Sequence, residues 1–527
     1  MFHVIPQSCR VGIVCVGFYL LLCLAVFAAI LKQTGGHFLY TLDDPYIHLA
    51  LAENLSQGHY GINSDHPASP SSSVIWPLLL IPFAGHRWHS YNPLLFNILL
   101  GGASAWIIGR VIDRWPGSFF QRGCEREVEQ WKHAFIGCLL VLVANLVSLT
   151  FTGMEHVLQI FLALCCAYAV TETMAERPIP TWTLLAAVLG PSVRYENFSI
   201  TLCLALLLFL LHRRKLAITL VVLAALPLVG FSLYLHSLGL PALPTSVLVK
   251  GGATDSHISL LRSVYYRMRG TIHSVVTHPD RWPMLLLCVS AGFFVLMERN
   301  RIRRFALVGV MLVTGTHLLI FPFGWFHRYE VYALIFASLI LLDAMVQRPQ
   351  FRYSYVSLGV LALMSLSSVY TFVASPRAAS GIYGQQYQMH RFVTEFFHGR
   401  FAVNDLGLVS YQRAGDDYVV DLWGLGSHEA ALQQNKNAAW LVEIAHRNKV
   451  SLAMIYPDWY ESIPSSWKPI GMMCLTEKPI TATEPCVTFY STDLEQREHL
   501  EAAMRRFAET LPRQDTFTFS PLRLASR

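Results

Sequence analysis

Long apolar runs separated by short polar segments fill the first 374 residues of the chain. A helix needs about 20 apolar residues to cross the hydrocarbon core of a bilayer. The candidate runs are residues 11–31, 92–112, 133–152, 155–174, 181–193, 197–212, 216–236, 282–298, 304–323, 329–346 and 354–374. A further run, Val74 to Phe83, holds two prolines and is too short to cross alone. The pattern therefore predicts a polytopic α-helical membrane protein with about 11 spans, the first of them an uncleaved span rather than a signal peptide.

After residue 374 the pattern changes to short alternating runs with turn residues between them. Strands are predicted at 401–405, 418–422, 450–456 and 486–490, and helices at 438–447 and 494–511. The last stretch, 513–527, reads as a frayed end. We therefore divide the chain into a transmembrane catalytic module, residues 1–374 with an external loop at 32–73, and a soluble α/β domain, residues 375–527.

Composition supports a membrane protein and gives no reason to invoke nucleic acid. Of 527 residues, 54% are hydrophobic and only 14% are charged, against about 25% charged in soluble proteins. The net charge of +6 comes largely from basic clusters between spans, as cytoplasmic loops require. These clusters are Arg110 to Lys132, Arg213 to Lys215, Arg299 to Arg304, and Arg348 to Arg352. Alternation across eleven spans then places 32–73, 237–281 and the C-terminal domain outside the cytoplasm.

Two of the eleven cysteines, Cys474 and Cys486, lie in the polar C-terminal region rather than in an apolar run. If that region is outside the cytoplasm, a disulfide between them is plausible.

Two adjacent carboxylates, Asp43 and Asp44, follow the first apolar run. Ionised groups at a membrane boundary are costly, so their presence there indicates a function. Asp44 before Pro45 also fits a simple helix start, with Asp44 as the cap of a helix through Asn54. A cap needs one carboxylate, so Asp43 is the better candidate for a general base, its proton affinity raised by its neighbour. His48 could meet Asp44 on one helix face, although a solvated loop histidine is the simpler interpretation.

Arginines recur where the positive-inside pattern does not expect them. Arg194-Tyr195-Glu196 and Arg328-Tyr329-Glu330 both fall at predicted outer ends of spans. The guanidinium fork of arginine suits a phosphate, although pairing with a nearby glutamate would also explain each one. Lys250 is a third external cation, and Glu155-His156 adds a polar pair of structural or functional character.

No nucleotide-binding, zinc or serine-hydrolase motif is present, so the energy for a reaction must come from the substrate. The two aspartates could hold a divalent ion, but nothing clearly supplies the other ligands, and we expect neither a metal nor a cofactor.

The order of these motifs resembles that of the GT-C glycosyltransferases, and among them bacterial enzymes such as the mycobacterial terminal arabinofuranosyltransferases. The resemblance rests on Asp43 to Ile47, Ala52 to Gly58, Asn63, Ser69 to Trp76, Thr152 to Glu155, Arg194 to Glu196, Leu243 to Thr245 with Lys250, Asp405 to Gly407, Tyr411 and Val420 to Leu425. Pro45, Tyr195 and Ser69 to Ser73 depart from the family pattern and leave the donor sugar open.

The resemblance implies a multi-pass enzyme of the bacterial inner membrane with its active site on the extracytoplasmic side. Such an enzyme transfers a sugar, here of an arabinofuranose type, from a polyprenyl-phosphate donor to a glycan, lipid or protein acceptor, with inversion. Asp43, assisted by Asp44, would be the base, and His48, Glu155, Arg194, Glu196, Lys250 and Arg328 would contact substrate. A transporter or flippase of lipid-linked sugars, which would use external charges without covalent chemistry, is the alternative. A non-catalytic assembly protein that binds cell-wall material through its C-terminal domain is a third.

Overall fold

The computed structural model describes residues 10–519 apart from 116–125, 251–269, 271–273, 276, 347–353, 414–416 and 513–514. The chain forms two compact units, each built from several stretches of sequence. The first holds residues up to Phe27, Leu94–Gly230 and His257–Val373, and the second holds Ala28–Pro93, Phe231–Ser256 and Ala374–Arg527. Residues 28–93 thus belong to the same unit as the C-terminal residues.

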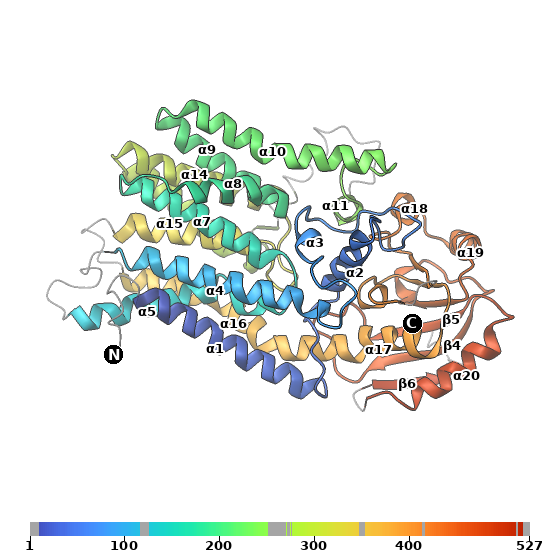
Figure 1. Ribbon diagram of the computed structural model, residues 1–527. Helices are drawn as coiled ribbons and strands as arrows, with labels where there is room; N and C mark the ends of the chain where they lie inside the picture. Colours follow the sequence, from blue (N-terminus) through green and yellow to red (C-terminus); the bar gives the residue numbers. More distant parts are fainter. Residues whose placement is uncertain are drawn as a thin grey trace. The chain divides into compact units, whose positions relative to one another are not determined.

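Helices make up the first unit (Figure 1). In chain order they are α1 (Arg10–Gln33), α4 (Asn92–Ile112), α5 (Arg126–Val143), α6 (Leu146–Thr150), α7 (His156–Met174), α8 (Thr181–Val193), α9 (Phe198–Leu210), α10 (Arg214–Ser237), α13 (Trp282–Met297), α14 (Arg301–Ile320), α15 (Val331–Val346) and α16 (Ser354–Gly384). Helices α1, α10 and α16 continue into the second unit.

Seven helices of the described residues are long and apolar enough to cross a membrane. They are α1, α4, α7, α10, α13, α14 and α16, and four shorter apolar helices lie at Gln130–Val143, Thr181–Val193, Tyr195–Leu210 and Val331–Val346. A helical membrane architecture is therefore supported, while the count of eleven spans stays a prediction. Helix α7 is the most enclosed of the seven, with 89% of its apolar window buried.

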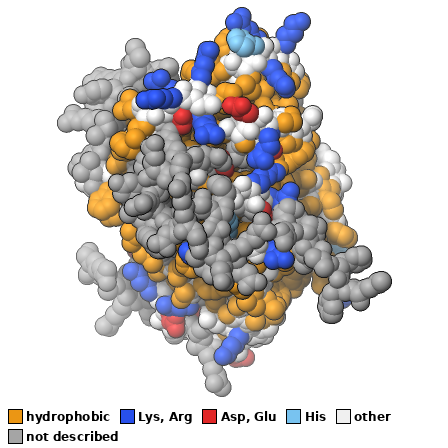
Figure 2. All heavy atoms as spheres, turned by 90° about the vertical axis from the view of Figure 1, so that its left-hand side faces the viewer, with side chains coloured by type: hydrophobic (Ala, Val, Ile, Leu, Met, Phe, Trp, Pro, Cys, Tyr) orange, Lys and Arg blue, Asp and Glu red, His pale blue; other side chains and the backbone are white. Residues whose placement is uncertain are grey.

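One end of the helical unit carries the basic loops. Figure 1 places the start of α1 and the ends of α4 and α9 at this end. Figure 2 views it directly and shows Lys and Arg side chains spread over the face, with few acidic ones. The cluster from Arg348 to Arg352 lies outside the described residues. The common location of the other basic loops is what the positive-inside pattern requires of a cytoplasmic end.

The predicted run at 133–152 is not one helix. Asn145 adopts a left-handed backbone conformation with φ of 48°, which ends α5 and starts α6. Its side chain makes this break rigid: the amide donates to the carbonyl of Phe326 at 3.2 Å, and Oδ1 accepts from the Thr371 hydroxyl at 2.9 Å. An asparagine tolerates this conformation better than most residues, which explains the interruption in an apolar run.

The second unit holds a six-stranded mixed sheet with the strand order β2-β1-β3-β5-β4-β6. The strands are β1 (Phe401–Val403), β2 (Val419–Asp421), β3 (Leu452–Ile455), β4 (Lys468–Leu475), β5 (Cys486–Ser491) and β6 (Asp515–Phe519). Its helices include α2 (Asp44–Ser56), α3 (Trp76–Leu79), α11 (Thr245–Lys250), α17 (Gln386–Arg391), α18 (His428–Leu432), α19 (Ala438–Arg447) and α20 (Arg497–Ala508). Strands β2, β1 and β3 are parallel, and the rest pair antiparallel.

All four predicted strands and both predicted helices of this domain are confirmed. The expectation of a frayed end was wrong for 515–519, which form the edge strand β6 against β4. β6 alternates Thr and Phe and has no fully buried residue, so its apolar signal is weak. Strand β4 was missed because proline and glycine interrupt it.

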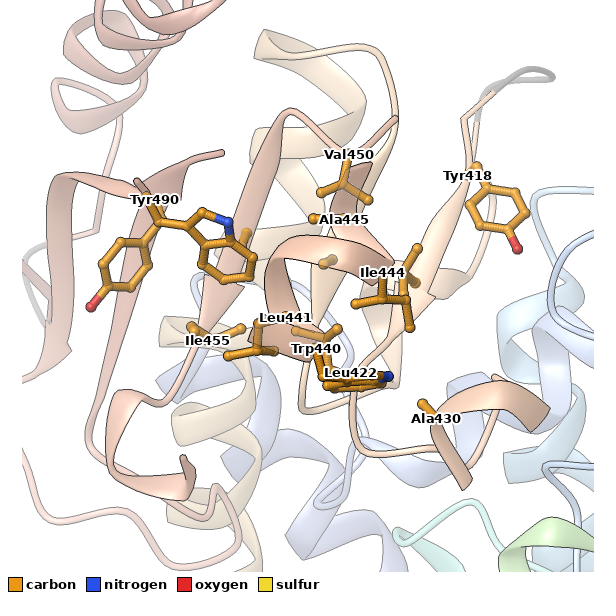
Figure 3. Close-up of a cluster of buried hydrophobic side chains, with 14 residues drawn as sticks. Tyr418, Leu422, Ala430, Trp440, Leu441, Ile444, Ala445, Val450, Ile455 and Tyr490 are labelled. Carbon is orange, nitrogen blue, oxygen red and sulfur yellow. The ribbon is translucent and has the colours of Figure 1, made fainter. Parts of the chain in front are cut away.

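Helix α19 shows how the core of this domain forms. Asn437 caps it by accepting the backbone N–H of Trp440 at 3.0 Å. Trp440, Leu441 and Ile444 then lie on one helix face and pack on the sheet, together with Leu422 and Ile455 (Figure 3). The helical period of the sequence thus translates directly into a buried face.

Cys474 and Cys486 form the expected disulfide, which joins β4 to β5 across 12 positions of sequence. We expect Cys474→Ser combined with Cys486→Ser to lower the free energy of unfolding by about 2–4 kcal/mol, because the open loop regains conformational freedom when unfolded. The loss is measured by titrating the full chain with urea and using proteolytic cleavage after residue 378 as the readout of unfolding. Cys288→Ser is the matched control, since Cys288 is unpaired. An unchanged urea midpoint in the double variant would contradict the expectation.

Candidate functional site

The carboxylate of Asp43 is held by a residue far away in the sequence. Asp43 directly precedes α2, but its side chain makes no capping bond to that helix. Instead, Oδ1 accepts the backbone N–H of Leu408 at 2.8 Å, across 365 positions of sequence. Oδ2 is buried and has no hydrogen-bond partner among the described residues. A buried carboxylate oxygen without a donor costs free energy, so it indicates a function.

Gly407 lets the carboxylate come this close. A Cβ atom at this position would lie 1.8 Å from Oδ2 and 2.4 Å from Oδ1 of Asp43. The φ of Gly407 is −176°, an extended value that any residue can adopt. The requirement for glycine is therefore steric, and the three nearest atoms all belong to the Asp43 carboxylate.

A second acid, Asp405, lies in the same loop after β1. Its Oδ2 accepts from the Tyr456 hydroxyl at 2.9 Å and from the Gln386 amide at 3.1 Å. The Tyr456 oxygen also lies 2.7 Å from Oε1 of Gln385. One phenol proton serves only one of these acceptors at a time, so both bonds form together when Asp405 carries a proton.

Both acids have a raised affinity for a proton. Burial raises the pKa of Asp43 well above its usual value, and the nearby charge of Asp405 raises it further, while the Leu408 N–H opposes both. Burial likewise raises the pKa of Asp405, against the lowering effect of the bonds from Tyr456 and Gln386. A carboxyl whose pKa moves toward neutrality can take a proton from a hydroxyl.

Asp44 and His48 are placed differently from the sequence-based expectations. Helix α2 begins at Asp44 itself, so Asp43 rather than Asp44 occupies the cap position. His48 is buried, with 4% of its surface exposed, so its interpretation as a solvated loop residue was wrong. Every residue of α2 from Pro45 to Ala52 is buried, so the helix is enclosed on all sides there and His48 with it.

In the helical unit, Arg194 lies between two glutamates. Its guanidinium donates to Oε1 of Glu155 at 3.1 Å and to both oxygens of Glu196, at 2.6 and 3.2 Å. All three side chains are at most 10% exposed. The sequence left two interpretations of Arg194 open, an anion site and a pairing with a nearby glutamate. The structure shows the pairing. Glu155 precedes α7 and Arg194 follows α8, so both lie at the end opposite the basic loops.

Arg328 joins this cluster through Tyr329. The Arg328 guanidinium lies 5.0 Å from the centre of the Tyr329 ring, and that of Arg194 lies 5.5 Å from the same ring. Arg328 also donates to the Tyr329 hydroxyl at 3.0 Å. The two arginines that the sequence singled out are therefore brought together around one tyrosine. Lys250 ends α11, and its side chain lies outside the described part of the structure.

Sequence reasoning missed Asp405, Gly407, Gln386 and Tyr456 as site residues. A signal was available, because Asp405 is the last residue of a predicted strand, and the carboxyl ends of parallel strands are where ligands bind in such sheets. Among the described residues, no group of three or more His, Cys, Asp or Glu side chains could hold a metal ion.

A polar pocket of about 770 Å³ lies at the other end of α2. Glu53, Asn54, Arg400, Arg413 and Asp417 are among its lining residues, while Asp43 and Asp405 are not. Arg413 is fixed there by bonds to Asn63 and to three backbone carbonyls, so it builds the wall of the pocket.

Comparison with known proteins gives few matches. A family model described as a domain of unknown function, DUF8728, matches residues 378–490, which is less than half of the chain. The search of curated proteins found no match.

Two solved structures align over most of the chain. ArnT from Cupriavidus metallidurans bound to undecaprenyl phosphate has a TM-score of 0.46 and 10% identity, covering 91% of this chain and 98% of that chain. The oligosaccharyltransferase of Archaeoglobus fulgidus, in complex with zinc and sulfate, has a TM-score of 0.46 and 10% identity, covering 89% and 73%. At this TM-score the two similarities carry no argument about a shared fold or activity.

Proposed function

We propose that the protein is an inverting glycosyltransferase that moves a sugar from a polyprenyl-phosphate donor to a hydroxyl acceptor. The observation that carries the proposal is the buried Oδ2 of Asp43, which has no donor among the described residues and lies close to a second acid. The order of sequence motifs, which resembles that of GT-C glycosyltransferases, supports the same function.

The reaction needs one base and one good leaving group. Asp43 takes the proton of the acceptor hydroxyl, and the freed oxygen attacks the anomeric carbon of the donor sugar. The bond from that carbon to the phosphate oxygen breaks, and polyprenyl phosphate leaves with the electron pair. Attack from the side opposite the phosphate inverts the configuration. Because phosphate leaves readily without protonation, a second acid is not required at the leaving group.

The arginine cluster would stabilise the leaving phosphate. Arg194 is paired with Glu155 and Glu196, and Arg328 lies over the Tyr329 ring. We assign both arginines, with Lys250 as a further cation, to the phosphate. An arginine fork suits this task because it bonds two phosphate oxygens at once.

The proposed location is the extracytoplasmic side of a bacterial inner membrane, with an arabinofuranose-like donor sugar. The disulfide supports that side for the C-terminal domain, because disulfides persist in oxidising compartments. A carrier of lipid-linked sugars would also bind through charged residues. It would have no use for a buried carboxylate oxygen kept without a donor beside another acid.

Replacement of the base tests the proposal. We expect Asp43→Asn to lower transfer by about 10²–10⁴-fold, because the amide cannot accept the hydroxyl proton. The assay uses purified protein with labelled polyprenyl-phosphate arabinofuranose and 4-amino-arabinose donors. Asp280→Asn is the control, since Asp280 is exposed. Full activity in both Asp43→Asn and Asp44→Asn would exclude the mechanism.

Gly407→Ala tests the position of the base without changing it. The added Cβ would collide with Oδ2, so the carboxylate must move, and we expect transfer to fall about 10²-fold, as for a misplaced reacting group. Gly381→Ala is the matched control, because a Cβ there meets nothing within 4 Å. If Gly407→Ala kept normal transfer and stability, the close contact would have no catalytic meaning.

The pH dependence follows from the paired acids. Transfer requires ionised Asp43, so the rate should rise with pH through the pKa of Asp43. Asp405→Asn removes a nearby negative charge that raises this pKa, while Asp44 remains, so the acidic limb of the rate profile should move to lower pH. The measurement is kcat/KM between pH 4 and 9 for wild type and variant. A limb that stays in place or moves to higher pH would disprove the coupling.

A further inference from the structure

Three parallel strands of the sheet end at the edge that holds Asp405. Asp405 follows β1, Trp423 follows β2, and Trp459 follows β3. In Figure 3, Leu422 and Ile455, which mark the ends of β2 and β3, lie toward one side of the core, away from Tyr418 and Val450. Loops at the carboxyl edge of parallel strands are the usual place for a ligand.

Two tryptophans at this edge contact each other near the surface. The ring centres of Trp423 and Trp459 are 4.9 Å apart and their planes differ by 59°. Trp423 remains 41% exposed. Lys436 donates to the backbone carbonyl of Trp423 and lies 5.2 Å from its ring, and Asp458 beside Trp459 is exposed. An aromatic surface is thus presented with one cation beside it and with a carboxylate on the residue that precedes Trp459.

A continuous series of contacts connects these tryptophans to the proposed base. Trp459 lies 5.4 Å from the ring of Tyr456, whose hydroxyl bonds Asp405 at 2.9 Å. Three residues after Asp405, the N–H of Leu408 bonds Asp43. Three residues span at most about 10 Å of chain. The tryptophans are thus linked to the proposed base through Tyr456 and the loop after β1.

We propose that Trp423 and Trp459 form a platform that binds a sugar ring of the acceptor, which is then a neutral oligosaccharide. The inference rests on the proposed function and names its acceptor. A pyranose or furanose ring has an apolar C–H face that packs on an indole and a hydroxyl rim that needs donors and acceptors. Lys436 and Asp458 supply one donor group and one acceptor group at that rim. Because the charges of Lys436 and Asp458 are opposite, they leave no excess of positive charge that would favour an anionic polymer.

The test measures binding separately from transfer. The probes are neutral oligosaccharides of arabinose, galactose and glucose, about four to six units long. Each is titrated separately into full-length Asp43→Asn protein in detergent. That protein binds without turnover. We expect Trp423→Ala, added to it, to weaken binding about fivefold to tenfold, the loss of one aromatic contact, and Trp423→Phe to restore most of it. Trp182→Ala is the matched control, since Trp182 is 49% exposed in the helical unit.

The active protein gives a second readout. There, Trp423→Ala should raise the KM for the acceptor and leave the KM for the lipid-linked donor unchanged, which a general loss of structure would not do. The platform is overturned if no neutral oligosaccharide binds, if only uronic-acid oligosaccharides bind, or if Trp423→Ala binds like Trp182→Ala. If binding depends on Trp423 but no donor supports transfer, the platform stands and the proposed reaction fails.

Discussion

The hydrogen bond from the Leu408 N–H to Asp43 is the constraint on which the candidate site depends. It fixes one carboxylate oxygen, and the absence of a side chain at Gly407 gives the other oxygen its place. Helix α2 then carries the acid from one direction and the loop after β1 from the other. Neither segment could hold the carboxylate alone, because the donor and the space come from the loop after β1 and the acid comes from the segment after α1.

The price of this arrangement is a buried pair of acids. Two carboxyls in a water-poor place cannot both ionise easily, so one tends to keep a proton. Two hydrogen bonds, from Tyr456 and Gln386, stabilise the ionised form of Asp405, whereas a single bond, from the Leu408 N–H, stabilises that of Asp43. The ionised form of Asp43 therefore has fewer hydrogen-bond donors. That asymmetry in hydrogen bonding distinguishes Asp43, the proposed base, from Asp405.

The sequence predicted the elements better than the contacts. The helical period of Ala438 to Arg447 and the short strands at 401, 419, 452 and 486 needed only local patterns, and all were found. The break at Asn145 depends on Phe326 and Thr371, which no local pattern reveals. The sequence singled out Asp43, Arg194 and Arg328 as candidates because charge near apolar runs is conspicuous. Asp405 was not, because an acid after a short strand in a polar domain looks ordinary until its distant neighbour is known.

The second unit is assembled from three stretches of sequence, which begin at Ala28, Phe231 and Ala374. Asp43 is made early in synthesis, whereas the amide that holds it is made more than 360 residues later. A nascent or truncated chain could therefore insert its first helices and still lack a fixed carboxylate. The fixed position of the Asp43 carboxylate therefore depends on synthesis of the chain through Leu408.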